Sequence, residues 1–341
     1  HNEGADLEML TEMLARRYNL GEENFPMLRE DIRDFLRQMQ SMGMIIETLK
    51  PPIDAPALCV SIAGLRIDFH GPAQLFSGYF DDFCMSESDT DADQEIEFRT
   101  VPPASNAYGK VLLRNDDMTI FENADRYVVL FPQMANIHQV HMTLDGSYVQ
   151  FYCTPETSDL ARENIFHAVR LFFLFIAQQH GKFAIHSASI LYKEKAWLFS
   201  GHSGMGKSTH TSMWHEFLQT PYLNGDLNLL GIENDRIMVY GIPWCGTSEI
   251  YTTVNYELGG IILLGRDPEK DFLKELTPSE RVIRVMQRMI SPSWKERCFS
   301  RNLDFAGDIA EHVPVLYLLC TKNPSAVYTI QKEIDRLEDL R

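Results

Sequence analysis

The sequence lacks long apolar runs and any excess of basic residues. Its longest apolar run, residues 171–177, falls far short of the roughly 18 residues that a membrane-spanning helix needs. The 31 lysines and arginines are outnumbered by 48 aspartates and glutamates, which leaves a formal net charge of -17. Nucleic acid is bound through a basic field that displaces counterions from phosphates. We therefore expect a protein that does not span a membrane and does not bind nucleic acid.

The sequence also has no paired cysteines. The six cysteines stand at positions 59, 84, 153, 245, 298 and 320, and no two of them form a C-x-x-C pair. This spacing predicts neither a disulfide framework nor a zinc site. The first residues show no signal-peptide pattern, so we expect a reducing, cytoplasmic setting. The oligomeric state, and whether further residues precede His1, stay open.

Hydrophobic spacing divides the chain into three regions. Residues 6–18 and 24–42 carry apolar side chains three and four apart, which predicts two amphipathic helices in a small domain over residues 1–48. After a proline-rich linker, residues 52–160 hold short strand-like runs between turn residues and predict a β-rich segment. Residues 161–341 alternate helical and strand-like patterns. The expected fold is mixed α and β.

The third region opens with an apolar helix over residues 161–180. FAIHSASILY (183–192) and AWLFS (196–200) then predict two strands joined by a turn, and YLNGDLNLLGI (222–232) predicts a further strand. A capping box followed by proline predicts a helix over residues 277–290.

The most informative string is GHSGMGKS, which begins at Gly201 and fits G-x-x-x-x-G-K-S. It follows a predicted strand and opens a predicted helix, which is the setting that a phosphate-binding loop requires. Glycines let backbone amides turn toward a polyphosphate, and the helix N-terminus adds positive partial charge. We expect ATP and Mg²⁺ as cofactors, with Lys207 on the β and γ phosphates and the Ser208 hydroxyl on the metal. The candidate nucleotide-binding residues are Gly201, Ser203, Gly204, Met205, Gly206, Lys207, Ser208 and Thr209.

Two residues outside the loop are candidates for the chemistry. Magnesium beside a triphosphate usually needs a carboxylate at the end of a neighbouring strand, and Asp226 is the best candidate. The alternative is a turn aspartate that follows Asn224 and Gly225. His186 lies one predicted hairpin before the loop, so its side chain is placed near the γ-phosphate if the two strands pair. The alternative is a structural histidine in a strand.

The segments HSASIL, FSGHSGMGKST and LNGDLNLL, in this order, resemble the catalytic core of HPr kinase/phosphorylase and its relatives. Those proteins share their nucleotide site with ATP-dependent phosphoenolpyruvate carboxykinase. The resemblance covers roughly residues 165–265 and implies a P-loop kinase core of that kind. It implies that Lys207, Ser208 and Thr209 bind ATP and Mg²⁺, that Asp226 is the acidic partner, and that His186 lies near the transferred phosphate.

The sequence departs from this family at one important position. HPr kinase/phosphorylase has two consecutive aspartates where this chain has Gly225 and Asp226, and its C-terminal signature loop is not recognisable here. Phosphorylase activity and HPr as the substrate are therefore doubtful. GIPWCGTSE (241–249) resembles a subgroup of kinase-like proteins of peptide-modification clusters. Glu249 is a candidate for the missing carboxylate, although an exposed loop residue is the expected reading.

Two further features have open interpretations. The N-terminal helices resemble the C-terminal half of a PqqD-like winged-helix domain, a fold that binds the leader segment of precursor peptides as an added strand. The alternative is a structural cap. Arg281, Arg284 and Arg288 are spaced for one helical face, where a solvated surface is expected rather than an anion site.

These observations predict an ATP-dependent kinase that phosphorylates a serine hydroxyl of a peptide or protein, a class that includes ribosomally made precursor peptides. His186, Lys207 and Asp226 are the predicted catalytic residues, and Ser208 and Asp226 the predicted metal ligands. One alternative is a kinase of a small molecule such as free serine. The other is a nucleotide-binding regulator or chaperone without turnover, which Gly225 makes credible. The acceptor itself stays open.

Overall fold

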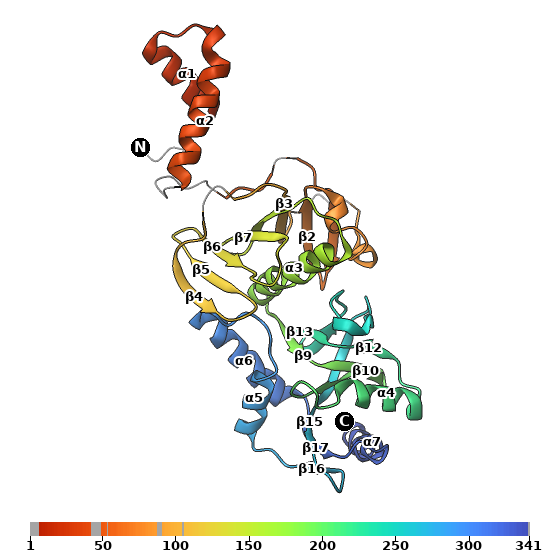
Figure 1. Ribbon diagram of the computed structural model, residues 1–341. Helices are drawn as coiled ribbons and strands as arrows, with labels where there is room; N and C mark the ends of the chain where they lie inside the picture. The colour runs from red at the N-terminus through yellow and green to blue at the C-terminus, as the bar shows by residue number, and fades with distance from the viewer. Residues whose placement is uncertain (1–6, 42–48, 53, 87–90, 104–105, 340–341) are drawn as a thin grey trace.

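The computed structural model describes residues 7–41, 49–52, 54–86, 91–103 and 106–339. Within them the chain is a mixed α+β protein with two large sheets and helices that cover their faces (Figure 1). The fold class predicted from the sequence is confirmed. None of the described helices is long and apolar enough to cross a membrane.

The N-terminal region is a pair of helices, α1 (Leu7–Tyr18) and α2 (Phe25–Ser41), joined by the short 3-10 helix η1 (Glu22–Asn24). Both predicted helices are confirmed. The pair stands away from the two sheets in Figure 1. The boundary predicted at residue 48 falls in residues 42–48, which lie outside the described part of the chain.

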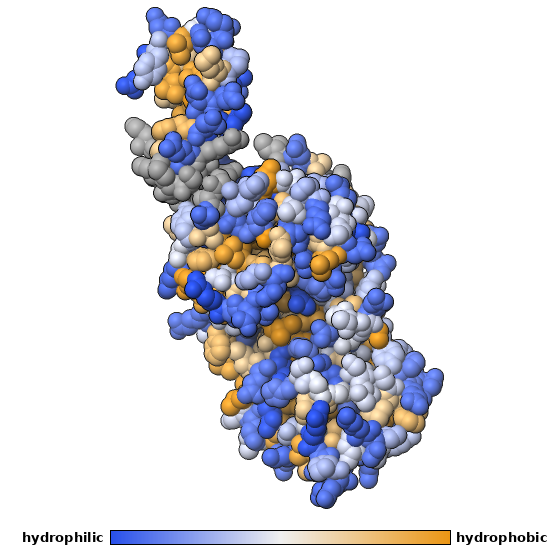
Figure 2. Space-filling model, in the orientation of Figure 1, coloured by the Kyte–Doolittle hydropathy of each residue, from blue (hydrophilic) through white to orange (hydrophobic). Residues whose placement is uncertain are grey.

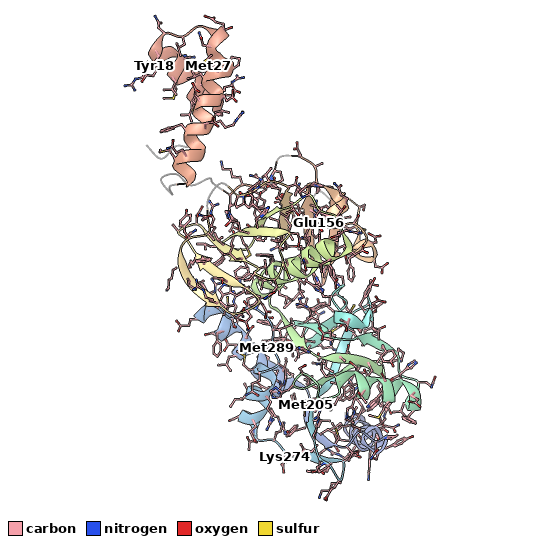
Figure 3. The ribbon with its side chains drawn as sticks, viewed as in Figure 1. Tyr18, Met27, Glu156, Met205, Lys274 and Met289 are labelled. Atoms are coloured by element: carbon pink, nitrogen blue, oxygen red, sulfur yellow. The ribbon has the colours of Figure 1, made fainter. Side chains whose placement is uncertain are left out.

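The helix pair exposes much of its apolar surface. Ala15 and Ile32 are buried, but Tyr18 and Met27 at its far end are 66% and 68% exposed. Figure 2 shows orange side chains on this pair, and Figure 3 labels Tyr18 and Met27 beside each other at its tip.

The first sheet has eight strands in the order β1-β2-β3-β8-β7-β6-β5-β4. Side chains alternate along its strands, so that Ile96 and Phe98 of β3 and Phe151 of β8 are buried on one face. That face packs against α3. The elements of this part are β1 (Leu58–Ile62), β2 (Leu65–His70), η2 (Ala73–Leu75), η3 (Asp81–Phe83), β3 (Gln94–Arg99), β4 (Lys110–Arg114), β5 (Thr119–Glu122), β6 (Arg126–Leu130), β7 (Ile137–Thr143) and β8 (Tyr148–Cys153).

Helix α3 (Asp159–Gln179) joins the two halves of the core. Ser158 Oγ caps its N-terminus by accepting a hydrogen bond from the Ala161 N–H at 3.3 Å. Its apolar residues cluster with the first sheet and also with Leu227 of strand β13 (Leu227–Glu233). A helix that is apolar on most sides needs such burial. The predicted helix is confirmed, and it contributes to both parts of the molecule.

The second sheet has nine strands, seven of them in the order β12-β10-β11-β15-β14-β13-β9, while β17 pairs with β15 and β16. Strand β11 runs parallel to β15, and β15 runs parallel to β17. Their carboxyl ends therefore meet at one edge. The strands are β9 (Lys182–His186), β10 (Ala188–Tyr192), β11 (Lys195–Ser200), β12 (Tyr222–Asn224), β13 (Leu227–Glu233), β14 (Arg236–Tyr240), β15 (Tyr256–Arg266), β16 (Phe272–Lys274) and β17 (Val315–Cys320).

Two of the predicted strands are each divided. The run predicted as one strand over 183–192 breaks at Ser187, because β9 pairs with β13 whereas β10 pairs with β11 and β12. The run over 222–232 breaks at Gly225 and Asp226, between β12 and β13. The prediction of continuous strands was wrong at both places, and both breaks lie at the candidate site.

Helices cover both faces of the parallel strands. Helices α4 (Lys207–Leu218) and α7 (Ser325–Glu338) share an apolar cluster with Trp197 and Phe199 of β11. Helices α5 (Pro278–Met286) and α6 (Glu296–His312) share another with Ala196 and Leu198. Successive side chains of β11 point to opposite faces of the sheet, so one strand contributes to the apolar contacts of both helix layers.

The helix predicted over 277–290 is shorter than expected. Its capping box at Thr277 and Glu280 is present, but α5 ends at Met286. The next residues turn to the sheet instead, where Met289 forms a backbone bridge with Ile185 of β9. Pairing with the sheet replaces the last predicted helical turn.

Candidate functional site: a glycine loop at a strand crossing

The glycine loop connects β11 to α4 and has the backbone that a phosphate loop needs. Gly204 and Gly206 have φ angles of +73° and +97°, a left-handed conformation that favours glycine. Gly206 occupies the N-cap of α4, so the helix N-terminus opens directly from the loop. Ser203 and Ser208 are exposed, and the Arg266 guanidinium donates to the Gly204 carbonyl oxygen at 2.5 Å.

Buried polar side chains fix the crossing of β9, β10 and β13. Asn228 Nδ2 donates to the Ser187 carbonyl oxygen at 2.6 Å, and Ser189 Oγ donates to Asn228 Oδ1 at 2.7 Å. Ser200 Oγ donates to the His186 carbonyl oxygen at 2.6 Å. All these hydrogen bonds satisfy groups that water does not reach. They hold the end of β9, and with it His186, beside the end of β11.

A second set of hydrogen bonds shapes the turn that carries Asp226. Asn224 Oδ1 accepts from the N–H groups of Asp226 and Leu227, each at 3.0 Å. Asn224 Nδ2 donates to the Trp244 carbonyl oxygen at 3.1 Å. This asparagine therefore makes the break between β12 and β13 and points the Asp226 carboxylate out of the sheet.

The three predicted catalytic residues come together. Lys207 Nζ lies 2.6 Å from His186 Nε2, and Asp226 Oδ1 lies 3.3 Å from the same nitrogen. One ring nitrogen cannot accept and donate at once. Burial, followed by the charge of Lys207, lowers the pKa of His186. The neutral ring therefore accepts from the Lys207 ammonium, and the Asp226 carboxylate keeps its lone pairs for another partner.

Arg288 is a third charged group at the site, after Lys207 and Asp226. Its carbonyl oxygen accepts from the His186 N–H at 2.9 Å, and its guanidinium lies 3.0 and 3.2 Å from the two ring nitrogens of His202 in the loop. Arg284 instead lies over the Tyr317 ring, 4.3 Å from its centre. The expectation of one solvated arginine face was wrong, because α5 ends before Arg288 and the backbone carries this side chain to the loop.

Arg170 of α3 is a further site residue that sequence reasoning missed. It is half-buried, and its charge acts on both Asp226 and His186. Burial lowers the pKa of the Arg170 guanidinium, which Asp226 partly offsets. One signal was available in the sequence: it is a charged residue inside the apolar pattern of residues 161–180.

Among the described residues, the three cations Lys207, Arg170 and Arg288 form no ion pair, because no carboxylate oxygen lies within 4.0 Å of their side-chain nitrogens. Desolvated cations without counter-charges are unfavourable. In a protein with a net charge of -17, their convergence indicates an anion-binding site.

The structure has no space for an aspartate side chain at position 225, because Ser248 fills it. A Cβ at Gly225 would lie 2.0 Å from Ser248 Oγ, which belongs to the turn η4 (Gly246–Ser248). Ser248 Oγ is held there by donating to the Cys245 carbonyl oxygen at 2.6 Å. Glu249, the candidate replacement carboxylate, is exposed at the end of this turn. This arrangement leaves Asp226 as the carboxylate beside His186.

A cavity of about 490 Å³ opens beside the loop. It lies at the shared carboxyl edge of β11, β15 and β17, where open α/β sheets bind ligands. His210 Nε2 lies 3.2 Å from Cys320 Sγ, while His210 Nδ1 is buried and has no hydrogen-bond partner in the described part of the chain. Residues that line the cavity include Gly204, Gly206, Thr209, Arg266, Cys320 and Asn323.

The residues present fit Mg²⁺ beside a phosphate. The Ser208 hydroxyl in the first turn of α4 and the Asp226 carboxylate supply the oxygen ligands that this ion prefers. Among the described residues, no group of three or more histidines, cysteines or acids could hold a metal ion by itself. A magnesium site here would therefore share its ligands with a phosphate.

No protein-family model matches this chain. No curated protein matches it either. Among solved structures, it is similar to the Hpr(Ser) kinase/phosphatase from Coxiella burnetii, with 11% sequence identity and a TM-score of 0.28 over 46% of this chain and 93% of that chain. That likeness is too low to assign an activity or a residue role, so the case for function rests on the geometry above.

Proposed function

We propose that this protein is an ATP-dependent kinase that phosphorylates a serine hydroxyl of a peptide or protein. The observation that carries the proposal is that Lys207 and Arg288, neither of which forms an ion pair among the described residues, meet at a glycine loop at a helix N-terminus. Such a site is complementary to the charge of a transferring phosphoryl group. The cavity beside the loop has room for a nucleoside.

Each residue then has a role in positioning and charge neutralisation. The loop amides and Lys207 hold the β and γ phosphates, and Ser208 and Asp226 would hold Mg²⁺, which neutralises phosphate charge. The acceptor oxygen forms a bond to the γ-phosphorus while the bond from that phosphorus to the bridging oxygen breaks. The hydroxyl proton passes to the Asp226 carboxylate, and ADP leaves. His186 fixes the Lys207 ammonium.

One observation favours a second candidate. Ser248 occupies the space where a second carboxylate would stand, so the protein has one carboxylate fewer than the kinases it resembles in sequence. A nucleotide-binding regulator without turnover would need only one carboxylate at this site. Transfer of phosphate to any acceptor eliminates this candidate.

The first test is the rise in melting temperature on adding MgATP. A ligand that binds only the native state must stabilise it, so we expect a clear rise in the wild-type protein and none in Lys207→Ala. Lys332→Ala, an exposed lysine on α7, is the matched control and should keep the full shift. An equal shift in Lys207→Ala would show that ATP does not use this loop.

A second test separates a peptide acceptor from free serine. If the N-terminal helices recruit a leader peptide, deletion of residues 1–48 should raise the KM for a peptide by tenfold or more, while MgATP binding stays intact. The preserved MgATP shift is the control for folding of the remaining chain. Unchanged peptide kinetics would favour a structural cap, and equal activity on free serine would favour a small-molecule kinase.

A further inference from the structure

Helix α3 presents Arg170 to the turn that covers Asp226. Phe166, Arg170 and Phe173 lie four and three residues apart, and hence on one face of the helix. The rings of Phe166 and Phe173 pack on Trp244, with centroids 5.7 and 4.9 Å away, and Trp244 Nε1 donates to the Phe166 carbonyl oxygen at 3.0 Å. Arg170 lies between two residues that both contact Trp244, so it faces the same loop.

That loop continues directly onto Asp226. The turn η4 begins two residues after Trp244, and a Cβ at Gly246 would lie 2.8 Å from Asp226 Cβ. Arg170 therefore approaches Asp226 from α3, on the side of the first sheet. Lys207 and Arg288 approach from α4 and from the end of α5, which lie on the other side of β9 and β13 in Figure 1.

Within the described ranges, the Arg170 guanidinium forms no hydrogen bond, and it does not come within the 4.0 Å of an ion pair with Asp226. Yet its charge acts on Asp226 and on His186. A half-buried guanidinium near a carboxylate, with no ion pair between the two, keeps its donors available for an anionic group of a ligand.

The two sides of Asp226 have different chemistry available. On the α4 side, loop amides, Lys207 and Arg288 already provide charge for the donor phosphates. On the α3 side, the described groups near Asp226 are His167, whose ring lies 3.5 Å from the Glu163 carboxylate, and the Arg170 guanidinium, whose planar donors suit a carboxylate. An acceptor whose hydroxyl points at Asp226 would place its neighbouring groups on this side.

We propose that Arg170 binds a carboxylate of the acceptor, so that the substrate is a serine-type hydroxyl compound with a carboxylate close to its hydroxyl. This inference rests on the proposed kinase function and names the substrate class of the same site. The carboxylate belongs either to a free hydroxy amino acid or to a residue of a peptide. Arg170 contributes acceptor affinity and takes no part in nucleotide binding.

The test compares two product-like probes on the full chain with saturating MgADP. O-phospho-L-serine and O-phosphoethanolamine differ only by the carboxylate. Isothermal calorimetry should show roughly ten- to hundredfold tighter binding of phosphoserine, the effect of one charge-assisted pair. Arg170→Gln should abolish the preference, and Arg170→Lys should keep part of it. Arg162→Gln, on the same helix but hydrogen-bonded to the Ser77 carbonyl oxygen, is the matched control.

A second pair of probes identifies the source of the carboxylate. Blocked dipeptides in which phosphoserine follows aspartate or alanine replace the free amino acid. A preference for the aspartate peptide that Arg170→Gln abolishes would assign the carboxylate to a peptide. A preference confined to free phosphoserine would assign it to a small hydroxy acid.

Three results have distinct meanings for this proposal. Equal binding within both pairs of probes would overturn it. An Arg170→Gln variant that weakens phosphoserine and phosphoethanolamine alike would also overturn it, because the guanidinium would then bind phosphate. Absence of MgADP binding in the wild-type protein would contradict the kinase function itself, and the calorimetry detects that before any phospho-compound is added.

Discussion

At the scale of single residues, the His186 ring accepts a hydrogen bond from Lys207 and does not use the Asp226 carboxylate as its partner. The short contact of Lys207 with His186 Nε2 goes with the lowered pKa of that histidine, for which burial is the main cause. Burial also lowers the pKa of Lys207, which makes its proton easier to share with the ring. Asp226 is left as the carboxylate that can receive a proton or bind a metal.

Replacing Asp226 by asparagine should therefore reduce turnover by orders of magnitude and change MgATP affinity less. In the proposed kinase, the carboxylate would matter most as charge develops during transfer, whereas the loop and Lys207 would bind the ground state. Steady-state kinetics together with the MgATP melting shift measure the two effects separately. Asp304→Asn on α6, at an exposed position, is the control. Full turnover in Asp226→Asn would remove this residue from the mechanism.

At the scale of elements, the turn η4 packs directly against the break between β12 and β13. Gly225 has no unusual φ angle, so what requires glycine is the space that Ser248 occupies, where a Cβ would meet Oγ at 2.0 Å and Cβ at 2.4 Å. The glycine at position 225, where the resembled kinases have an aspartate, therefore depends on both the break between β12 and β13 and the turn η4.

A Gly225→Ala substitution should lower the free energy of unfolding by about 1–3 kcal/mol, because the turn must shift to admit the methyl group. Adding Ser248→Gly should recover a large part of that loss, since it removes both clashing atoms. Urea denaturation of the two single variants and the double variant measures the coupling. Strictly additive effects would mean that the two positions do not share this space.

Local patterns predicted the elements that depend on local chemistry. The loop, the helix after it and the capping box at Thr277 follow from glycine, lysine and capping residues that act within one turn. The break at Ser187 was missed because it depends on Asn228, which is 41 residues away. Helix α6 was not predicted, because Asn302 interrupts its apolar face, and that asparagine accepts from Gln178 Nε2 of α3 at 2.7 Å.

The same reasoning explains what the sequence revealed of the candidate site. His186 and Asp226 were singled out through a resemblance in motif order, and their contact is a result of strand pairing across β9 and β13. Arg170 comes from a helix whose pattern indicates only burial. Its position at the site depends on the packing of Trp244 between α3 and Asp226, which no local pattern encodes.

At the scale of the whole molecule, the fold keeps a buried histidine uncharged, and this couples stability to pH. His210 is 3% exposed beneath the cavity beside the glycine loop, and burial lowers its pKa to about 4. In the unfolded chain its pKa is about 6.5. Between these two values the unfolded state binds a proton that the folded state does not, so stability must fall as the pH is lowered from about 6.5 toward 4.

One such group contributes a slope of about 1.4 kcal/mol per pH unit in this window and nothing above it. Urea denaturation at steps between pH 7 and 4.5 should therefore show a steeper loss for the wild-type protein than for His210→Gln, which has no proton to exclude. His312→Gln, exposed at the end of α6, is the matched control and should keep the wild-type slope.

Because MgATP would bind over His210, adding it should raise stability at every pH without flattening the slope. A His210→Gln profile as steep as the wild type would mean that this histidine is protonated in the folded protein, and the cavity would then present a cation to the nucleotide.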